Sequence, residues 1–240
     1  MNVDLSIKLN FRTDTDNIEF DIIVEHFMYL TNEFGSLLST HPEWYETGYS
    51  RKKALEHLAF NKNGITEKTY QKWLKRYIKD TPLFVESIWD GNDDECSNGI
   101  SYRKMFFDEK NRVAVNAELN ISSDRFEISR VLNMISNLAN KFKCSHISLE
   151  SKGYTFHSRN VFPDRLSVGW MLYLPHVIIP DLVPEAAKVV PVMDGKKQKG
   201  TIVVSTEEVF DGNNKEHIGK ANDIEIRLLD LGLLPLLTEL

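Results

Sequence analysis

The chain has 240 residues, of which 42% are hydrophobic and 27% are charged, and this composition is typical of a folded globular protein and excludes the disordered class. Its 29 basic and 35 acidic residues give a net charge of -6, the wrong sign for a protein whose main affinity is for nucleic acid. The acidic balance is compatible with a basic protein partner, and also with solubility alone.

The first predicted elements are a strand and a helix. Polar and apolar residues alternate over residues 3–11, which predicts a strand. Apolar residues then recur at three- and four-residue steps over residues 20–34, which predicts an amphipathic helix. Asp16 and Glu19 have the spacing of a capping box at its start, and Gly35 is a candidate for its end.

A loop containing HPEWYETGYS follows, and two further helices are predicted over residues 51–60 and 67–79. The second of these carries an aromatic and aliphatic stripe at helical spacing, which we interpret as packing rather than as a ligand site. Its members are Tyr70, Trp73, Leu74, Tyr77 and Ile78.

The period of the pattern changes to two between Pro82 and Asn120. The segments LFVESIW, ISYRKMFF and RVAVNAEL read as strands, and the tetrapeptide DEKN at 108–111 makes a short turn between the last two. A turn of that length implies antiparallel pairing.

Ser123 and Asp124 then precede a strongly amphipathic helix that extends to Phe142 and could cover one face of the sheet. HISLES, SVGWMLYL and GTIVVST are further strand candidates. The proline-rich stretch between the last two is expected to be irregular, with one helical turn around 185–188. The segment 214–232 is left open between helix and strand. The sequence contains no repeat or linker, so we expect a single α+β domain over 1–240, with a mainly antiparallel sheet packed with amphipathic helices.

The most apolar segment, VGWMLYLP at 168–175, is too short to cross a bilayer, which takes about 20 residues. We interpret it as a strand buried on both faces, with Trp170 in the core. Gly169 is expected where a bulky neighbour or a bulge leaves no room for a side chain.

A search for chemistry finds no constellation that would support catalysis. The chain lacks a G-x-S-x-G elbow, a phosphate-binding glycine loop and a pair of histidines four residues apart. The loop DGNDDE resembles the start of a calcium loop, but Glu95 occupies the position that needs glycine and Ser101 the position that needs glutamate. We therefore expect no enzyme activity, no cofactor and no metal. His146 and His157 flank a predicted strand and are the pair to test if an unrecognised site exists.

Two features bear on the compartment. The N-terminal alternation includes Asp4 and Lys8, so we expect no signal peptide. Cys96 and Cys144 are too few for a disulfide framework, and free thiols fit a reducing environment. Cys96 also lies beside four carboxylates, which disfavour a reactive thiolate. The sequence predicts a cytoplasmic protein with no membrane partner.

Four phrases in the C-terminal half, VFPDR, VGWMLYLP, GTIVVSTEEVFDGNNKEH and KANDIEIRLLDLGLLP, resemble the immunity protein 52 family. Members are cytoplasmic antidotes encoded beside toxins of bacterial polymorphic and type VI secretion systems. The resemblance covers roughly Thr31 to Pro235 and is strongest over 120–235. It implies a non-enzymatic protein that binds and neutralises a toxin with a restriction-endonuclease-like nuclease domain. The motif residues that we assign to the scaffold are Gly169, Trp170, Tyr173, Pro175, Gly200 and Pro235.

Residues that contact a toxin must be exposed, so we look for them in polar loops. A nuclease has a basic cleft, which a carboxylate-rich loop could occupy, and Trp and Tyr are frequent interface anchors. The candidate interface residues are Trp44, Tyr45, Asp93, Asp94, Glu95, Glu207, Glu208 and Asp211. The alternative for each loop is a solvated turn, with Trp44 and Tyr45 packed against their own helix. The alternative functions are an adaptor or chaperone that loads the effector, and an enzyme with an unrecognised site.

Overall fold

The computed structural model describes residues 2–13, 18–38, 42–77, 83–107, 110–151 and 153–240. By their contacts the residues form two compact units. The first unit consists of Met1–Asn2 and Phe11–Met134, and the second of Val3–Asn10 and Ile135–Leu240. Each unit is an antiparallel sheet with helices, so the predicted α+β class is confirmed. A single domain over 1–240 stays a prediction.

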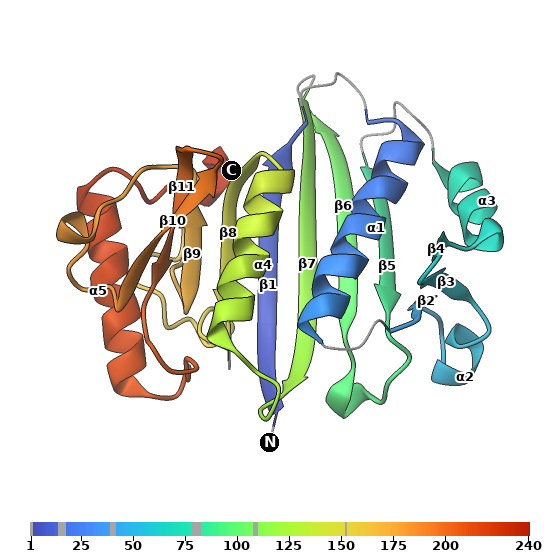
Figure 1. The fold of residues 1–240 in the computed structure, drawn as a ribbon, viewed down its shortest axis with the longest axis horizontal. Helices are drawn as coiled ribbons and strands as arrows, with labels where there is room; N and C mark the ends of the chain where they lie inside the picture. Colours follow the sequence, from blue (N-terminus) through green and yellow to red (C-terminus); the bar gives the residue numbers. More distant parts are fainter. Residues whose placement is uncertain (1, 14–17, 39–41, 78–82, 108–109, 152) are drawn as a thin grey trace. The chain divides into compact units, whose positions relative to one another are not determined.

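The first unit contains six strands in the order β7-β6-β5-β2-β3-β4. Their bounds are β2 Trp44–Glu46, β3 Leu58–Asn61, β4 Gly64–Ile65, β5 Leu83–Trp89, β6 Gly99–Phe107 and β7 Lys110–Ser122. Its helices are α1 Phe20–Leu37, α2 Arg51–Ala54 and α3 Glu67–Arg76. Figure 1 shows α1 lying along β5 and β6. The ring of Phe27 on α1 lies 5.6 Å from Phe60, 5.0 Å from Trp73 and 5.1 Å from Tyr102, so aromatic packing joins α1, α3, β3 and β6.

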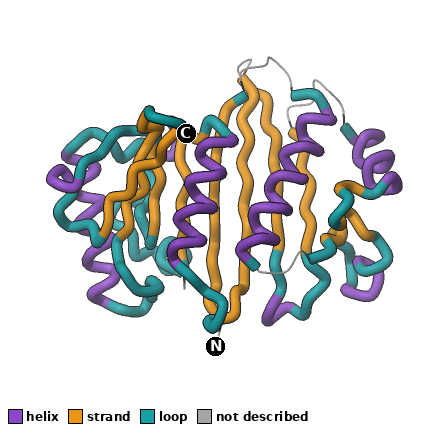
Figure 2. Tube along the Cα trace, in the orientation of Figure 1, coloured by secondary structure: helices purple, strands orange, loops and turns teal. Residues whose placement is uncertain are grey.

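The second unit contains five strands in the order β10-β11-β9-β8-β1. Their bounds are β1 Asn2–Arg12, β8 Cys144–Glu150, β9 Met171–Leu174, β10 Lys188–Asp194 and β11 Lys197–Val204. α5 spans Lys215–Asp230. Both α4, Ile128–Lys141, and β1 have residues in both units. Over the described residues 153–170, the connection between β8 and β9 contains neither helix nor strand, and Figure 2 draws such loop segments in teal.

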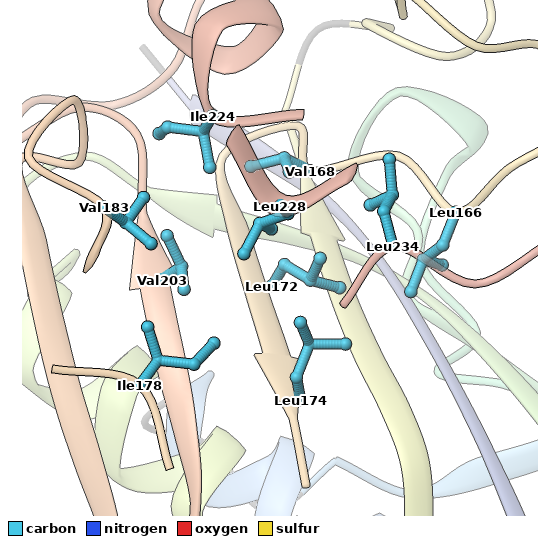
Figure 3. Close-up of a cluster of buried hydrophobic side chains, with 10 residues drawn as sticks. All are labelled: Leu166, Val168, Leu172, Leu174, Ile178, Val183, Val203, Ile224, Leu228 and Leu234. Carbon is cyan, nitrogen blue, oxygen red and sulfur yellow. The ribbon is translucent and has the colours of Figure 1, made fainter. Parts of the chain in front are cut away.

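The core of the second unit is an aliphatic cluster between β9, β11, α5 and their connections, drawn in Figure 3. Ile224 and Leu228 of α5 are fully buried in this cluster, whereas Ile226 is 45% exposed. Residues four apart on one buried face fit a helix, and a strand would have buried Ile224, Ile226 and Leu228 together. The packing therefore decides the segment 214–232 in favour of helix. The cluster consists of Leu166, Val168, Leu172, Leu174, Ile178, Val183, Val203, Ile224, Leu228 and Leu234.

Four sequence-based boundaries in the first unit are wrong. The helix predicted over 67–79 ends at Arg76, and Tyr77 has an extended backbone. The helix predicted over 51–60 ends at Ala54, because Phe60 pairs with Trp44 in the sheet and stacks on Phe27. The segment HPEWYE is not a loop throughout, since Trp44–Glu46 is strand β2. Gly35 does not end α1, which continues to Leu37. The cap at Asp16, the turn at 108–109 and Ile78 lie outside the described residues.

Two further differences lie in the second unit. The strand predicted over SVGWMLYL begins only at Met171, because Gly169 has a φ of 55°, which interrupts extended backbone. The stretch expected to be irregular contains strand β10, paired with β11 from Lys188 to Asp194. Pro191 is tolerated there because β10 is the last strand in the order and needs hydrogen bonds on one side only.

Candidate functional site

The first candidate region is the acidic loop of residues 90–98, which joins β5 to β6. The Asp90 carboxylate is buried and accepts hydrogen bonds from the backbone N–H groups of Asn92 and Asn98, each at 3.1 Å. The side-chain amides of the same two asparagines also donate to Asp90. Asp90 therefore organises the loop from inside and is not presented as a metal ligand. Among the described residues, no group of three His, Cys, Asp or Glu side chains could hold a metal ion.

The exposed carboxylates of this loop are partly neutralised. Asp93 is 77% exposed and lies 2.8 Å from Nη1 of Arg51, and Nη2 of Arg51 donates to the Gly91 carbonyl at 3.1 Å. Glu95 is also exposed, and the side chain of Asp94 lies outside the described positions. An exposed ion pair of this kind contributes at most about 1 kcal/mol, so a competing partner can break it.

Trp44 and Tyr45 lie on β2, where only Tyr45 reaches the surface. Trp44 is 2% exposed, and the half-buried Tyr45 donates from its hydroxyl to Glu43 at 2.8 Å. That hydrogen bond raises the pKa of Tyr45. The structure thus places Trp44 in the core, and a large exposed aromatic occurs instead at Tyr49, just before α2.

The second candidate region is the loop of residues 205–214 between β11 and α5. Glu207 and Glu208 are exposed, and Nε2 of the buried His217 lies 3.0 Å from Glu208. Because Nδ1 of His217 accepts the Asp211 backbone N–H at 3.0 Å, the ring proton must reside on Nε2 and be donated to Glu208. A hydrogen bond from backbone N–H and this bond from His217 lower the pKa of Glu208. The Asp211 side chain accepts from the Asn213 N–H at 3.0 Å, so Asp211 shapes the turn.

The scaffold motif supports this second loop. Trp170 is fully buried, and its indole N–H donates to the carbonyl of Thr206 at 3.1 Å. A Cβ on Gly169 would lie 2.8 Å from Cγ of Glu150, so the predicted bulky neighbour is Glu150. Tyr173 is buried in β9, Pro175 is exposed after that strand, and the Pro235 carbonyl accepts the Leu166 N–H at 3.1 Å.

The two histidines proposed as a test of enzymatic function have different environments. His146 is buried, with ring nitrogens 3.1 Å from Asn10 and 3.3 Å from Ser145, and burial lowers its pKa to about 4. His157 is exposed and packs edge-on against Phe156. The described partners of His146 are thus structural. Within the described residues no helix combines the length and the hydropathy that a membrane crossing requires.

Comparisons with known proteins were made for the whole chain. A sequence model of the family described as Immunity protein 52 matches residues 24–237. A search of curated proteins gave no match. Among solved structures, the Pseudomonas aeruginosa T6SS protein PA0821 superposes with a TM-score of 0.59 at 9% sequence identity, over 95% of this chain and 76% of that one. At this identity the structural match shows similarity of fold alone.

Proposed function

This chain belongs to the immunity protein 52 family, whose members are not enzymes, and we propose that it neutralises a cognate secreted bacterial toxin by binding it with one-to-one stoichiometry. The proposed toxin is a restriction-endonuclease-like nuclease effector of a polymorphic or type VI secretion system. The proposed place of action is the cytoplasm, where the two free cysteines, Cys96 and Cys144, would stay reduced.

We infer a basic partner because the protein has two acidic loops whose backbones are held in place by hydrogen bonds to buried side chains. Asp90 anchors the first loop through backbone N–H groups, and His217 anchors the second through the Asp211 N–H and Glu208. Each loop presents exposed carboxylates without requiring the chain to order on binding. Such carboxylates would attract the basic cleft with which a nuclease holds nucleic acid.

The proposed affinity is within reach of an ordinary interface. A nanomolar complex corresponds to about 12 kcal/mol, which an interface near 1,600 Å² can supply when a few anchors are well buried. Occlusion of the nuclease cleft is the simplest mechanism. Binding elsewhere on the toxin would inhibit only by preventing its folding, delivery or assembly.

The test compares the effect on association of removing two carboxylates within the proposed surface with the effect of removing two carboxylates outside it. Glu207→Gln with Glu208→Gln is expected to slow association with the toxin encoded beside the gene and to flatten its dependence on salt. Asp223→Asn with Asp230→Asn, two exposed acids on α5, changes the net charge equally and serves as the control. Equal effects of the two double variants would mean that overall charge, and not the second loop, steers the partner.

A second readout separates the antidote from an adaptor. An antidote abolishes toxin activity in the complex, whereas an effector-loading adaptor or chaperone binds and leaves that activity intact. Both activity and binding are therefore measured on the same mixtures.

A further inference from the structure

A short loop in the second unit exposes a phenylalanine. Phe156, in the connection between β8 and β9, is 85% exposed, more than any other Phe, Leu, Ile, Val or Met in the described part of the chain. Its ring touches only the edge of His157 among the ring contacts found there, with 5.1 Å between centroids. A single exposed apolar side chain is ordinary on a protein surface, so the exposure of Phe156 is informative only together with the way in which its loop is held.

The loop that carries Phe156 is internally hydrogen-bonded. The N–H groups of His157, Ser158 and Arg159 donate to the carbonyls of Gly153, Thr155 and Tyr154 at 3.0, 2.9 and 3.1 Å. Ser158 adopts a φ of 53°, a left-handed conformation that serine rarely occupies. The turn is thus held in one strained conformation, although the side chains of residues 156–159 are exposed to solvent.

Two buried glutamates tie down the ends of this turn. Glu150 accepts the Thr155 N–H at 3.0 Å and also the Thr155 hydroxyl. Glu225, which is fully buried on α5, accepts the Val161 N–H at 2.8 Å and the Val168 N–H at 3.0 Å. Val168 belongs to the aliphatic core drawn in Figure 3, so Glu225 links the turn to the buried core of the unit.

These attachments connect the exposed loop to the buried core of the unit. A buried carboxylate is costly unless hydrogen bonds satisfy it, and the described partners of Glu225 are Tyr154, Val161 and Val168. Two buried carboxyl groups and a left-handed serine therefore hold a segment whose central side chain is in water. This is the arrangement expected of a preorganised recognition loop, because ordering before binding removes an entropic penalty from association.

The turn and the second acidic loop pack on the same buried aromatic side chains. Tyr154, two residues before Phe156, is fully buried and packs edge-on against Phe210 with 5.5 Å between ring centroids. Phe210 lies two residues after Glu208 and also packs against His217 at 5.6 Å. One buried aromatic group therefore fixes both an exposed phenylalanine and an exposed pair of carboxylates.

We propose that Phe156 is the apolar anchor of the toxin-binding surface, and that Glu207 and Glu208, whose loop packs on the same buried aromatic side chains, belong to that surface. The inference rests on the proposed function and adds the chemistry of the partner's site, which is an apolar pocket bordered by basic side chains. A rigid aromatic anchor surrounded by polar groups is the usual composition of a binding hot spot. The carboxylates supply the charge complementarity that fits a nuclease.

The experiment measures the Kd between this protein and the toxin encoded beside its gene. Phe156→Ala is expected to raise the Kd about 30-fold or more, mainly through faster dissociation, and Phe156→Leu to retain most of the affinity. Leu83→Ala, at an exposed apolar position in the first unit, is the control and leaves the Kd unchanged. Thermal unfolding of all three variants should match the parent protein, since each side chain is mostly in water.

The outcomes distinguish the two proposals. If the parent protein binds the toxin and Phe156→Ala binds within about threefold of it, the anchor is refuted and the proposed function stands. If Phe156→Ala and Leu83→Ala weaken binding equally, the effect is not specific to the loop and the anchor is again refuted. If the parent protein does not bind the toxin, both the proposed function and the anchor fall.

Discussion

Gly200→Ala should destabilise the second unit, because the backbone of a neighbouring strand occupies the space that a side chain would need. Gly200 lies in β11, and a Cβ built on it would be 2.5 Å from the carbonyl oxygen of Leu174 in β9. The same atom would lie 2.5 Å from a ring carbon of Tyr173, which is itself buried. Neither neighbour can move without separating paired strands or displacing a core aromatic.

The magnitude follows from overpacking offset by a gain in strand propensity. Forcing a methyl group into a packed site costs about 1–3 kcal/mol, and more where backbone must shift, while replacing glycine in a strand regains about 0.5–1 kcal/mol. Because the neighbouring backbone must shift, the upper end of that cost applies, and we expect a net loss of about 2 kcal/mol, which for a chain of this size lowers Tm by roughly 4–8 °C.

Gly219→Ala is the matched control. Gly219 lies inside α5, and nothing approaches within 4 Å of the position of its Cβ. The same substitution should here raise stability by about 0.5–1 kcal/mol through helix propensity. Urea and thermal unfolding measure both variants. A Gly200→Ala protein within about 0.5 kcal/mol of the parent would refute the packing argument, because an unhindered surface change has that size.

Two further predictions concern pH dependence and association. Burial lowers the pKa of His146 from 6.5 to about 4. Between pH 6.5 and 4 this histidine therefore binds a proton in the unfolded chain but stays neutral in the folded protein. The free energy of unfolding should therefore fall by about 3 kcal/mol as the pH drops from 6.5 to 4. Urea titrations at several pH values measure this dependence, and His146→Gln should remove that part of it. A His146→Gln variant with the pH dependence of the parent protein would show that His146 is not responsible. Replacing Asp93, Asp94 and Glu95 by Asn, Asn and Gln should slow association with the toxin and reduce its salt dependence in stopped-flow measurements, and unchanged rates would remove the first loop from the interface.

Much of the fold follows from periodicity in the sequence. The hairpin of β6 and β7 and the helix α1 are visible as periods of two and 3.6 residues. The strands β3 and β10 could not be found this way. β3 exists because Phe60 pairs with the distant Trp44, and β10 because β11 supplies a partner for a proline-containing segment. Such pairings are set by tertiary contacts that a local pattern does not contain.

In the candidate site, too, some features can be predicted from the sequence and others depend on tertiary contacts. The acidic loops are evident from composition, but the ion pair between Arg51 and Asp93 and the hydrogen bond between His217 and Glu208 join residues that only folding brings together. Residue type favours Trp44 as an interface anchor, but its side chain is buried, whereas Phe156, which the sequence does not single out, is exposed. The signal for Phe156 in the sequence is an aromatic residue followed by the polar run HSRN at 157–160.

The central claim is stoichiometric inhibition, and one titration tests it directly. The toxin encoded beside the gene is mixed with rising amounts of this protein, and nuclease activity and complex formation are recorded together. The account predicts that activity disappears at one equivalent, in step with formation of the complex. Full nuclease activity in a saturated complex would contradict inhibition and favour an adaptor, and the lack of any complex would contradict the account as a whole.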